Sequence, residues 1–121
     1  MGKVYGYCRV ALASEEEAEK RIGMIKKYCE SNNLNLDKYF CDNGVSGFEV
    51  GDDFKQLMRE LENGDSVVVI NLSQLSRSNA RLLILIEQFE DMGVKIIYTD
   101  GNKVDTSSIK KWIDERWASQ Q

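Results

Sequence analysis

Histidine and proline are both absent from the 121 residues of this chain, and each absence narrows what the protein can be. Without histidine, the chain lacks the commonest general base, the commonest metal ligand and the imidazole of a histidine-dependent catalytic triad. Without proline or a low-complexity stretch, nothing marks a linker between two large domains. We therefore expect one main domain of ordinary size, with no metal and no cofactor.

Long apolar runs and cysteines are also scarce. No stretch of about 18 apolar residues is present, so no membrane-spanning helix is expected. The residues after Met1 lack the long apolar stretch of a signal peptide. The cysteines Cys8, Cys29 and Cys41 are odd in number and lack the spacing of a metal site. We expect reduced thiols in a cytoplasmic protein, with Cys8 and Cys29 on buried faces.

Positive charge is in deficit. The chain has 16 Lys and Arg residues against 20 Asp and Glu residues, a net charge of −4 and a pI of about 4.9. Nucleic-acid binders usually present a basic patch, because contacts with phosphates supply most of their affinity. We therefore expect any contact with DNA to be weak or indirect, although clustered arginines could still form a local site.

Apolar patterns of two kinds alternate along the chain. We expect strands at residues 4–10, 38–41, 66–72 and 94–98, and helices at residues 15–31, 54–61, 80–92 and 105–118. Gly93 should end the helix at 80–92. The strand at 66–72 is a nearly continuous apolar run, typical of a central parallel strand covered on both faces. The order predicts an α/β fold, a three-layer sandwich with a mainly parallel sheet of four or five strands. Residues 1–105 would form the main domain, and residues 106–121 a short C-terminal helix that could serve in dimerisation.

Three loops should meet at the carboxyl ends of the strands, where function usually sits in such folds. In the first loop, Ser14 could act as a nucleophile, or it could form a capping box with Glu17 at the start of a helix. We favour the cap, because the three glutamates of that first turn suit a helix N-terminus and would repel a phosphate.

The other two loops hold weaker signals. The segment Asp42-Asn43-Gly44-Val45-Ser46-Gly47 has elements of a phosphate cradle but not the spacing of a P-loop, and we favour a plain connection. Asp52 and Asp53 could be paired acids, but they more plausibly start the next helix. In the third loop, Arg77 could clamp a phosphate or could simply be a surface arginine.

Taken together, these segments resemble the catalytic domain of the serine site-specific recombinases, the resolvase/invertase family. The resemblance covers residues 4–106 and rests on Tyr7-Cys8-Arg9-Val10, Asp42 to Gly47, Gly64-Asp65, Ser66-Val67-Val68-Val69, Leu72 to Arg77, Gly93-Val94 and Asp105-Thr106. It implies a fold in which a serine attacks a DNA phosphodiester and forms a phosphoserine bond. In that family several arginines stabilise the charge on the phosphate.

The resemblance also implies that this site is degenerate. Arg9 and Arg77 fall on arginines of the family, and we expect both to bind phosphate. Ala11 falls on the nucleophilic serine, where a methyl group cannot form a covalent intermediate. Three further positions have lost their charged groups: the arginine expected before the second helix falls near Gly51, and an Asp-Arg pair falls on Ser73 and Gln74. We expect no catalytic activity from this set.

The expected last helix carries an apolar stripe formed by Ile109, Trp112, Ile113 and Trp117, which is either a core-packing face or a partner interface. Family members continue with a long dimerisation helix and a DNA-binding region, whereas this sequence ends at Gln121. Our first hypothesis is an inactive resolvase-like domain that pairs with itself or with a recombinase.

Two alternatives stay open at this stage. The chain could be a catalytic fragment of a working recombinase, either seen here as an inactive variant or using Ser14 as its nucleophile. It could also be an unrelated receiver-like or flavodoxin-like binding module. Against the latter, the first expected strand ends in Arg9-Val10-Ala11 and the third in Leu72-Ser73, so neither ends in a phosphoacceptor Asp. Glutamates stand where a flavin phosphate loop would be.

Overall fold

A single sheet forms the centre of the computed structural model, which describes residues 2–46, 48–99 and 103–104. Its strands are β1 (Val4–Val10), β2 (Leu36–Asn43), β3 (Ser66–Val69), β4 (Lys95–Tyr98) and β5 (Lys103–Val104), in the spatial order β2-β1-β3-β4-β5. The first four strands run parallel, and β5 pairs antiparallel with β4. The predicted mainly parallel α/β sheet is therefore confirmed.

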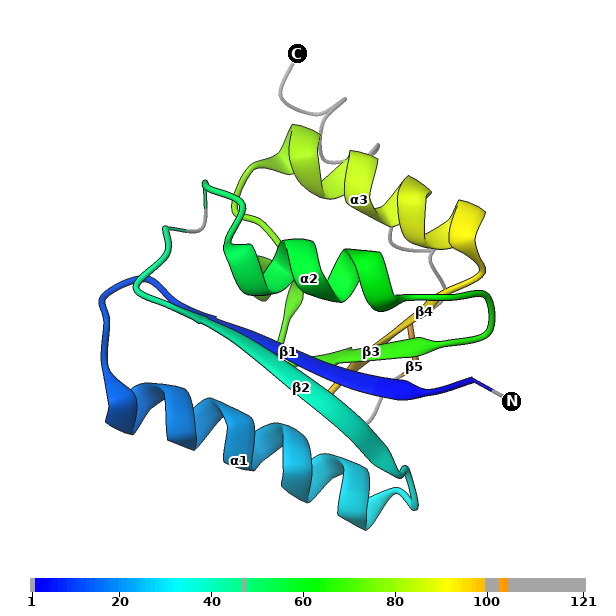
Figure 1. The fold of residues 1–121 in the computed structure, drawn as a ribbon, viewed down its shortest axis with the longest axis horizontal. Coiled ribbons are helices and arrows are strands. Elements are labelled where there is room, and N and C mark those ends of the chain that lie inside the picture. The colour runs from blue at the N-terminus through cyan, green and yellow to red at the C-terminus, as the bar shows by residue number, and fades with distance from the viewer. Residues whose placement is uncertain (1, 47, 100–102, 105–121) are drawn as a thin grey trace.

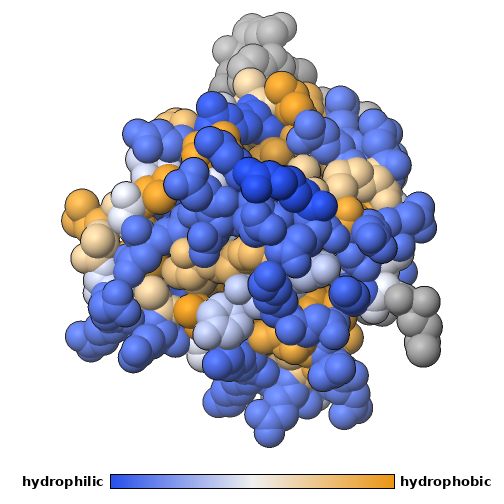
Figure 2. Space-filling model, viewed as in Figure 1, coloured by the Kyte–Doolittle hydropathy of each residue, from blue (hydrophilic) through white to orange (hydrophobic). Residues whose placement is uncertain are grey.

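Helices cover both faces of this sheet, which gives three layers (Figure 1). The helix α1 (Glu15–Ser31) lies on one side, and α2 (Asp52–Glu60) and α3 (Asn79–Met92) lie on the other. Each side has its own apolar cluster: Phe54, Leu57, Ile86 and Phe89 belong to the α2/α3 side, and Ile25 belongs to the α1 side. Hydrophilic side chains predominate on the face shown in Figure 2, with scattered apolar patches between them.

The strand β1 lies inside the sheet, between β2 and β3, and residues 5–10 are all buried. It pairs with β2 along its whole length and with β3 at its start. Gly6 brings α1 close to the sheet, because a Cβ at this position would lie only 2.9 Å from Cγ2 of Ile25. The residues that follow β1 are consequently held at a fixed place at the carboxyl edge of the sheet.

Two strand boundaries differ from the sequence-based expectation. The third strand ends at Val69, and the chain then forms a short 3-10 helix, η1 (Leu72–Gln74), because Leu75 turns inward and becomes almost fully buried. An apolar run does not by itself distinguish strand from helical turn. The second strand is longer than predicted, because pairing with β1 extends it through residues that face solvent.

Several local signals were read correctly. Asp52 and Asp53 form the first turn of α2, and Gly93 ends α3 with a left-handed φ of 71°. In the Gly64-Asp65 pair, the buried Asp65 carboxylate accepts backbone N–H groups from Lys3 and Glu62, at 2.8 Å in each case. This carboxylate joins the start of β1 to the turn before β3.

None of the helices in the described part of the chain is long and apolar enough to cross a membrane. The predicted C-terminal helix, its stripe of Ile109, Trp112, Ile113 and Trp117, and the domain boundary at residue 105 lie outside the described residues.

Candidate functional site

The carboxyl edge of the sheet brings together the loops that follow β1, β2 and β3. Arg9 and Asp42 are register partners on β1 and β2, one residue before each strand ends. The loop after β2 returns toward β1, where the N–H groups of Gly44 and Val45 donate to the carbonyl of Val10 at 2.7 and 3.1 Å. These amides are used internally, which supports the reading of this loop as a connection.

The guanidinium of Arg9 points into the protein. Only 4% of the residue is exposed. Its Nη1 donates to the carbonyl oxygens of Ser46 (2.7 Å) and Glu49 (2.5 Å), and its Nη2 donates to the Tyr7 hydroxyl (3.2 Å) and the carbonyl of Leu75 (3.3 Å). Within the described residues, its Nε has no partner. Arg9 thus ties the loop before α2 and the turn after η1 to the central strand.

Asp42 is the buried carboxylate beside it, with 5% of the residue exposed. Its Oδ2 accepts from the Tyr7 hydroxyl at 2.6 Å and from the backbone N–H of Phe54 at 3.0 Å, and its Oδ1 accepts from the N–H of Asp53 at 2.9 Å. It therefore caps α2 from a neighbouring strand, with negative charge at the positive helix end. Burial, together with the bond to Asp42, raises the pKa of Tyr7, so the phenol stays protonated and donates.

Gly51 leaves room for this carboxylate. A Cβ at position 51 would lie 2.1–2.3 Å from the carboxyl atoms of Asp42. The backbone of Gly51, with φ −79° and ψ 160°, is one that any residue adopts, so the constraint is steric. The arginine that the family resemblance places near this position does not fit at Gly51 while Asp42 caps α2.

Ala11 presents an exposed methyl group directly after β1. The nearest candidate hydroxyl along the chain, that of Ser14, accepts from the N–H of Glu17 at 3.1 Å, which confirms the predicted helix cap. The expected return bond from Glu17 is replaced. The N–H of Ser14 donates to Asn43 at 2.9 Å, because β2 brings that amide alongside, and the Glu17 carboxylate pairs with Arg21 at 3.0 Å.

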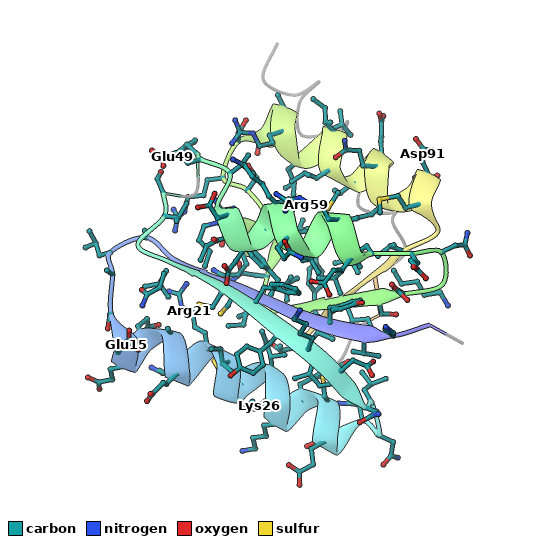
Figure 3. All side chains as sticks on the ribbon, in the orientation of Figure 1. Glu15, Arg21, Lys26, Glu49, Arg59 and Asp91 are labelled. Carbon is teal, nitrogen blue, oxygen red and sulfur yellow. The ribbon has the colours of Figure 1, made fainter. Side chains whose placement is uncertain are left out.

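Gln74 and Arg21 clamp the backbone where β1 ends. The buried Gln74 accepts from the N–H of Arg9 at 2.7 Å and from Nη1 of Arg21 at 3.3 Å. The same Nη1 donates to the carbonyl of Arg9. Figure 3 shows Arg21 reaching from α1 toward this edge. Sequence reasoning missed Arg21, although its i,i+4 spacing from Glu17 could have indicated a side chain held in place.

A cleft of about 410 Å³ opens beside this clamp. It is lined by Glu17, Lys20, Arg21, Met24, Ile70, Asn71, Ser73, Gln74 and Arg77. The structure thus brings together Ser73, Gln74 and Arg77 of the predicted set. Arg9, Ala11 and Gly51 are not among the lining residues. With three cationic side chains against one carboxylate, the cleft can accept an anion such as a phosphate.

The serines of the third loop support turns. The Ser73 hydroxyl bonds to the Asn71 side chain at 2.5 Å, the Ser76 hydroxyl accepts from the N–H of Ser78 at 3.1 Å, and the Ser78 hydroxyl accepts from the N–H of Arg81 at 3.3 Å. None of these three contacts supplies a base that could remove a hydroxyl proton. In the described part of the chain, no group of three or more Cys, Asp or Glu residues is placed to hold a metal ion.

Comparison with known proteins gives one family. The family described as "Resolvase, N terminal domain" matches residues 4–113. A "Resolvase/recombinase" of Pseudomonas putida is 33% identical over 99 residues, covering 81% of this chain and 51% of that protein. The "Transposon Tn917 resolvase" of Enterococcus faecalis is 30% identical over 105 residues, covering 87% and 53% respectively. The chain spans about half the length of these relatives.

Similar solved structures point to the same family. The N-terminal catalytic domain of TP901-1 integrase superimposes with a TM-score of 0.80 at 26% identity, covering 98% of both chains. A resolvase family site-specific recombinase from Streptococcus pneumoniae gives a TM-score of 0.70 at 25% identity, covering 99% of this chain and 93% of the other.

The steric role of Gly51 can be tested by two matched glycine substitutions. Gly51→Ala should lower the free energy of unfolding by about 2 kcal/mol, because Asp42 must leave the buried N–H groups that it caps. Gly23→Ala, in α1 with nothing within 4 Å of the added methyl group, should raise it by up to about 1 kcal/mol. Urea denaturation measures both. A neutral or stabilising Gly51→Ala would show that Asp42 does not restrict position 51.

Proposed function

The chain belongs to the resolvase family, through the N-terminal domain of that family, and from this premise we propose that it is a recombinase-type domain that has lost DNA cleavage and acts through contacts with other proteins. Family membership sets aside the alternative of an unrelated receiver-like or flavodoxin-like module. We place the protein in the cytoplasm, where the free thiols Cys8, Cys29 and Cys41 are the expected state.

The methyl group of Ala11 carries this proposal. Covalent catalysis needs a nucleophilic atom next to the scissile phosphate, and a methyl group offers none. Ser14 follows three residues later, but its hydroxyl caps α1. Its use as a nucleophile would uncap the helix, and the adjacent glutamates would repel the phosphate. We therefore regard Ala11 as the loss of the reaction rather than its displacement.

The surrounding charges support the same conclusion. Removing one preorganised donor to a transition-state charge typically costs about 10²–10³ in rate. Here the two positions assigned to arginines hold Gly51 and Gln74. Gln74 is neutral, and its side-chain oxygen accepts from the N–H of Arg9 and from Arg21. The combined losses should abolish cleavage.

We propose that Arg77 contacts a phosphate, with Lys20 and Arg21 beside it in the same cleft. Arg9 could join them only by giving up contacts such as those with Ser46 and Glu49, so its own phosphate contact remains a prediction. A small cationic cleft on a chain of net charge −4 supports weak or indirect contact with DNA.

A domain without DNA cleavage can still act by binding other proteins. The apolar stripe of Ile109, Trp112, Ile113 and Trp117 is our proposed interface, either with a second copy or with a recombinase. Exposed apolar side chains among the described residues also support binding to another protein: Phe48 is 63% exposed and Ile84 is 56% exposed. A groove of about 800 Å³ between α2 and α3 lies beside Ile84.

Loss of cleavage can be tested by searching for a covalent protein–DNA adduct. The unaltered chain and its Ala11→Ser variant are incubated with supercoiled DNA and with fragmented DNA of the source organism. Serine-linked nucleotides are then sought by mass spectrometry after nuclease digestion. An active resolvase on its own site is the positive control. We expect no adduct from either form, because Ala11→Ser does not replace the missing arginines.

A phosphoserine on the unaltered chain would overturn the proposal. It would instead identify a catalytic part of a working recombinase, the alternative that the half-length match to the relatives leaves open. An adduct from Ala11→Ser alone would show that the remaining residues suffice for cleavage and that only the nucleophile was lost.

Self-association can be tested by sedimentation velocity over a range of concentrations. We expect dimers whose dissociation constant rises at least tenfold when Trp112 and Trp117 are both replaced by Ala, because large aromatic anchors dominate interface energies. Leu12→Ala is the matched control, since Leu12 is an apolar side chain that is 86% exposed at a different place. Monomers at every concentration, or an equal effect of the control, would contradict an interface at the tryptophans.

A further inference from the structure

Two cysteines stand side by side on the two strands that lead to the candidate site. Cys8 of β1 and Cys41 of β2 are register partners in the parallel pair. Adjacent strands lie about 4.8 Å apart, and disulfides join residues whose Cα atoms are about 4.4–6.8 Å apart. The backbone therefore already holds these two residues at a separation that a disulfide can span.

Their side chains lie on the same face of the sheet. Both belong to the cluster under α1, with Cys8 fully buried and Cys41 packed against it while partly exposed. Cys29 belongs to the same cluster, but it comes from α1 rather than from a neighbouring strand position. The chain thus has one cysteine pair aligned by strand register and a third cysteine outside that register.

The two thiols differ in acidity. The hydrogen bond between them raises the pKa of Cys8, and burial raises it further. The same bond lowers the pKa of Cys41, as does the nearby Arg21 of α1, while burial, Asp42 of β2 and Asp53 of α2 oppose this. The thiolate therefore forms first at Cys41, which is the thiol that solvent can reach.

We propose that Cys8 and Cys41 form a reversible oxidation site, in which a peroxide converts the two thiols into a disulfide that joins β1 to β2. The thiolate of Cys41 attacks one peroxide oxygen, the O–O bond breaks and hydroxide leaves, which gives a sulfenic acid at Cys41. The sulfur of Cys8 then attacks that of Cys41, the S–O bond breaks and water leaves. Overall, the two thiols lose two electrons and two protons, and one hydrogen peroxide becomes two waters.

The position of the strands makes this bond reversible. The Cβ atoms of a disulfide are about 3.8 Å apart, whereas neighbouring strands lie about 4.8 Å apart, so a local twist of the strands must bring the two Cβ atoms closer by roughly 1 Å. Since β2 is at the edge of the sheet, it can make this movement. A disulfide formed under such strain is reduced easily. The bond would lie one residue before Arg9 and Asp42, directly beneath the network that fixes the loops of the candidate site.

The experiment counts thiols in the full chain before and after treatment with hydrogen peroxide. The protein is unfolded in denaturant, titrated with a chromogenic disulfide reagent, and mapped by non-reducing peptide mass spectrometry. We expect the count to fall from three to one, with the peptides of Cys8 and Cys41 linked. The mass should drop by about 2 Da, and dithiothreitol should restore all three thiols.

Two single substitutions are the controls. In Cys29→Ser, the thiol count should fall from two to none after peroxide treatment, because Cys8 and Cys41 are both still present. Cys41→Ser should retain both of its thiols under the same mild treatment. Three results would overturn the proposal: a linkage that includes Cys29, a sulfinic acid at Cys41 without any disulfide, or three thiols that persist although a model dithiol in the same tube is oxidised.

Discussion

A buried carboxylate, that of Asp42, fixes the geometry of the candidate site. It accepts hydrogen bonds from Tyr7 on the neighbouring strand and from two backbone N–H groups at the start of α2. A buried charge is stable only when it is paired or fully hydrogen-bonded, so these donors must stay in place. The lack of a side chain at Gly51 follows from the same requirement. Asp42 therefore fixes the start of α2 against the sheet, together with the apolar packing of Phe54 and Leu57.

The cationic groups at this edge divide into two sets with different uses. Arg9 is buried and bonds to carbonyl oxygens of the surrounding loops, so it stabilises the site from within. Arg77 is exposed and lines a cleft with Lys20 and Arg21. Phosphate chemistry would need donors converging on one reacting atom next to a nucleophile. The first strand instead leads to the methyl group of Ala11, which supports a domain that keeps the recombinase scaffold without its reaction.

Local patterns predicted much of this molecule, and long-range contacts explain what they missed. The Ser14 cap and the Gly93 helix end depend on residues close in sequence, so both were predicted correctly. Asp42 looked like a loop residue, because its donors lie on another strand and at the start of a helix. The roles of Arg21 and Gln74, and the pairing of Cys8 with Cys41, depend on strand register and on how α1 packs, which spacing alone does not fix.

The most direct measurement of the central claim is a crystal structure of the chain with a bound phosphate group, from inorganic phosphate or a short DNA duplex. We predict a phosphate beside Arg77, with Lys20 and Arg21 lining the same cleft. No serine Oγ should lie within about 3.5 Å of the phosphorus, the distance that attack requires. A phosphate held by Arg9 and Arg77 together, with a serine hydroxyl aligned for attack, would contradict the account.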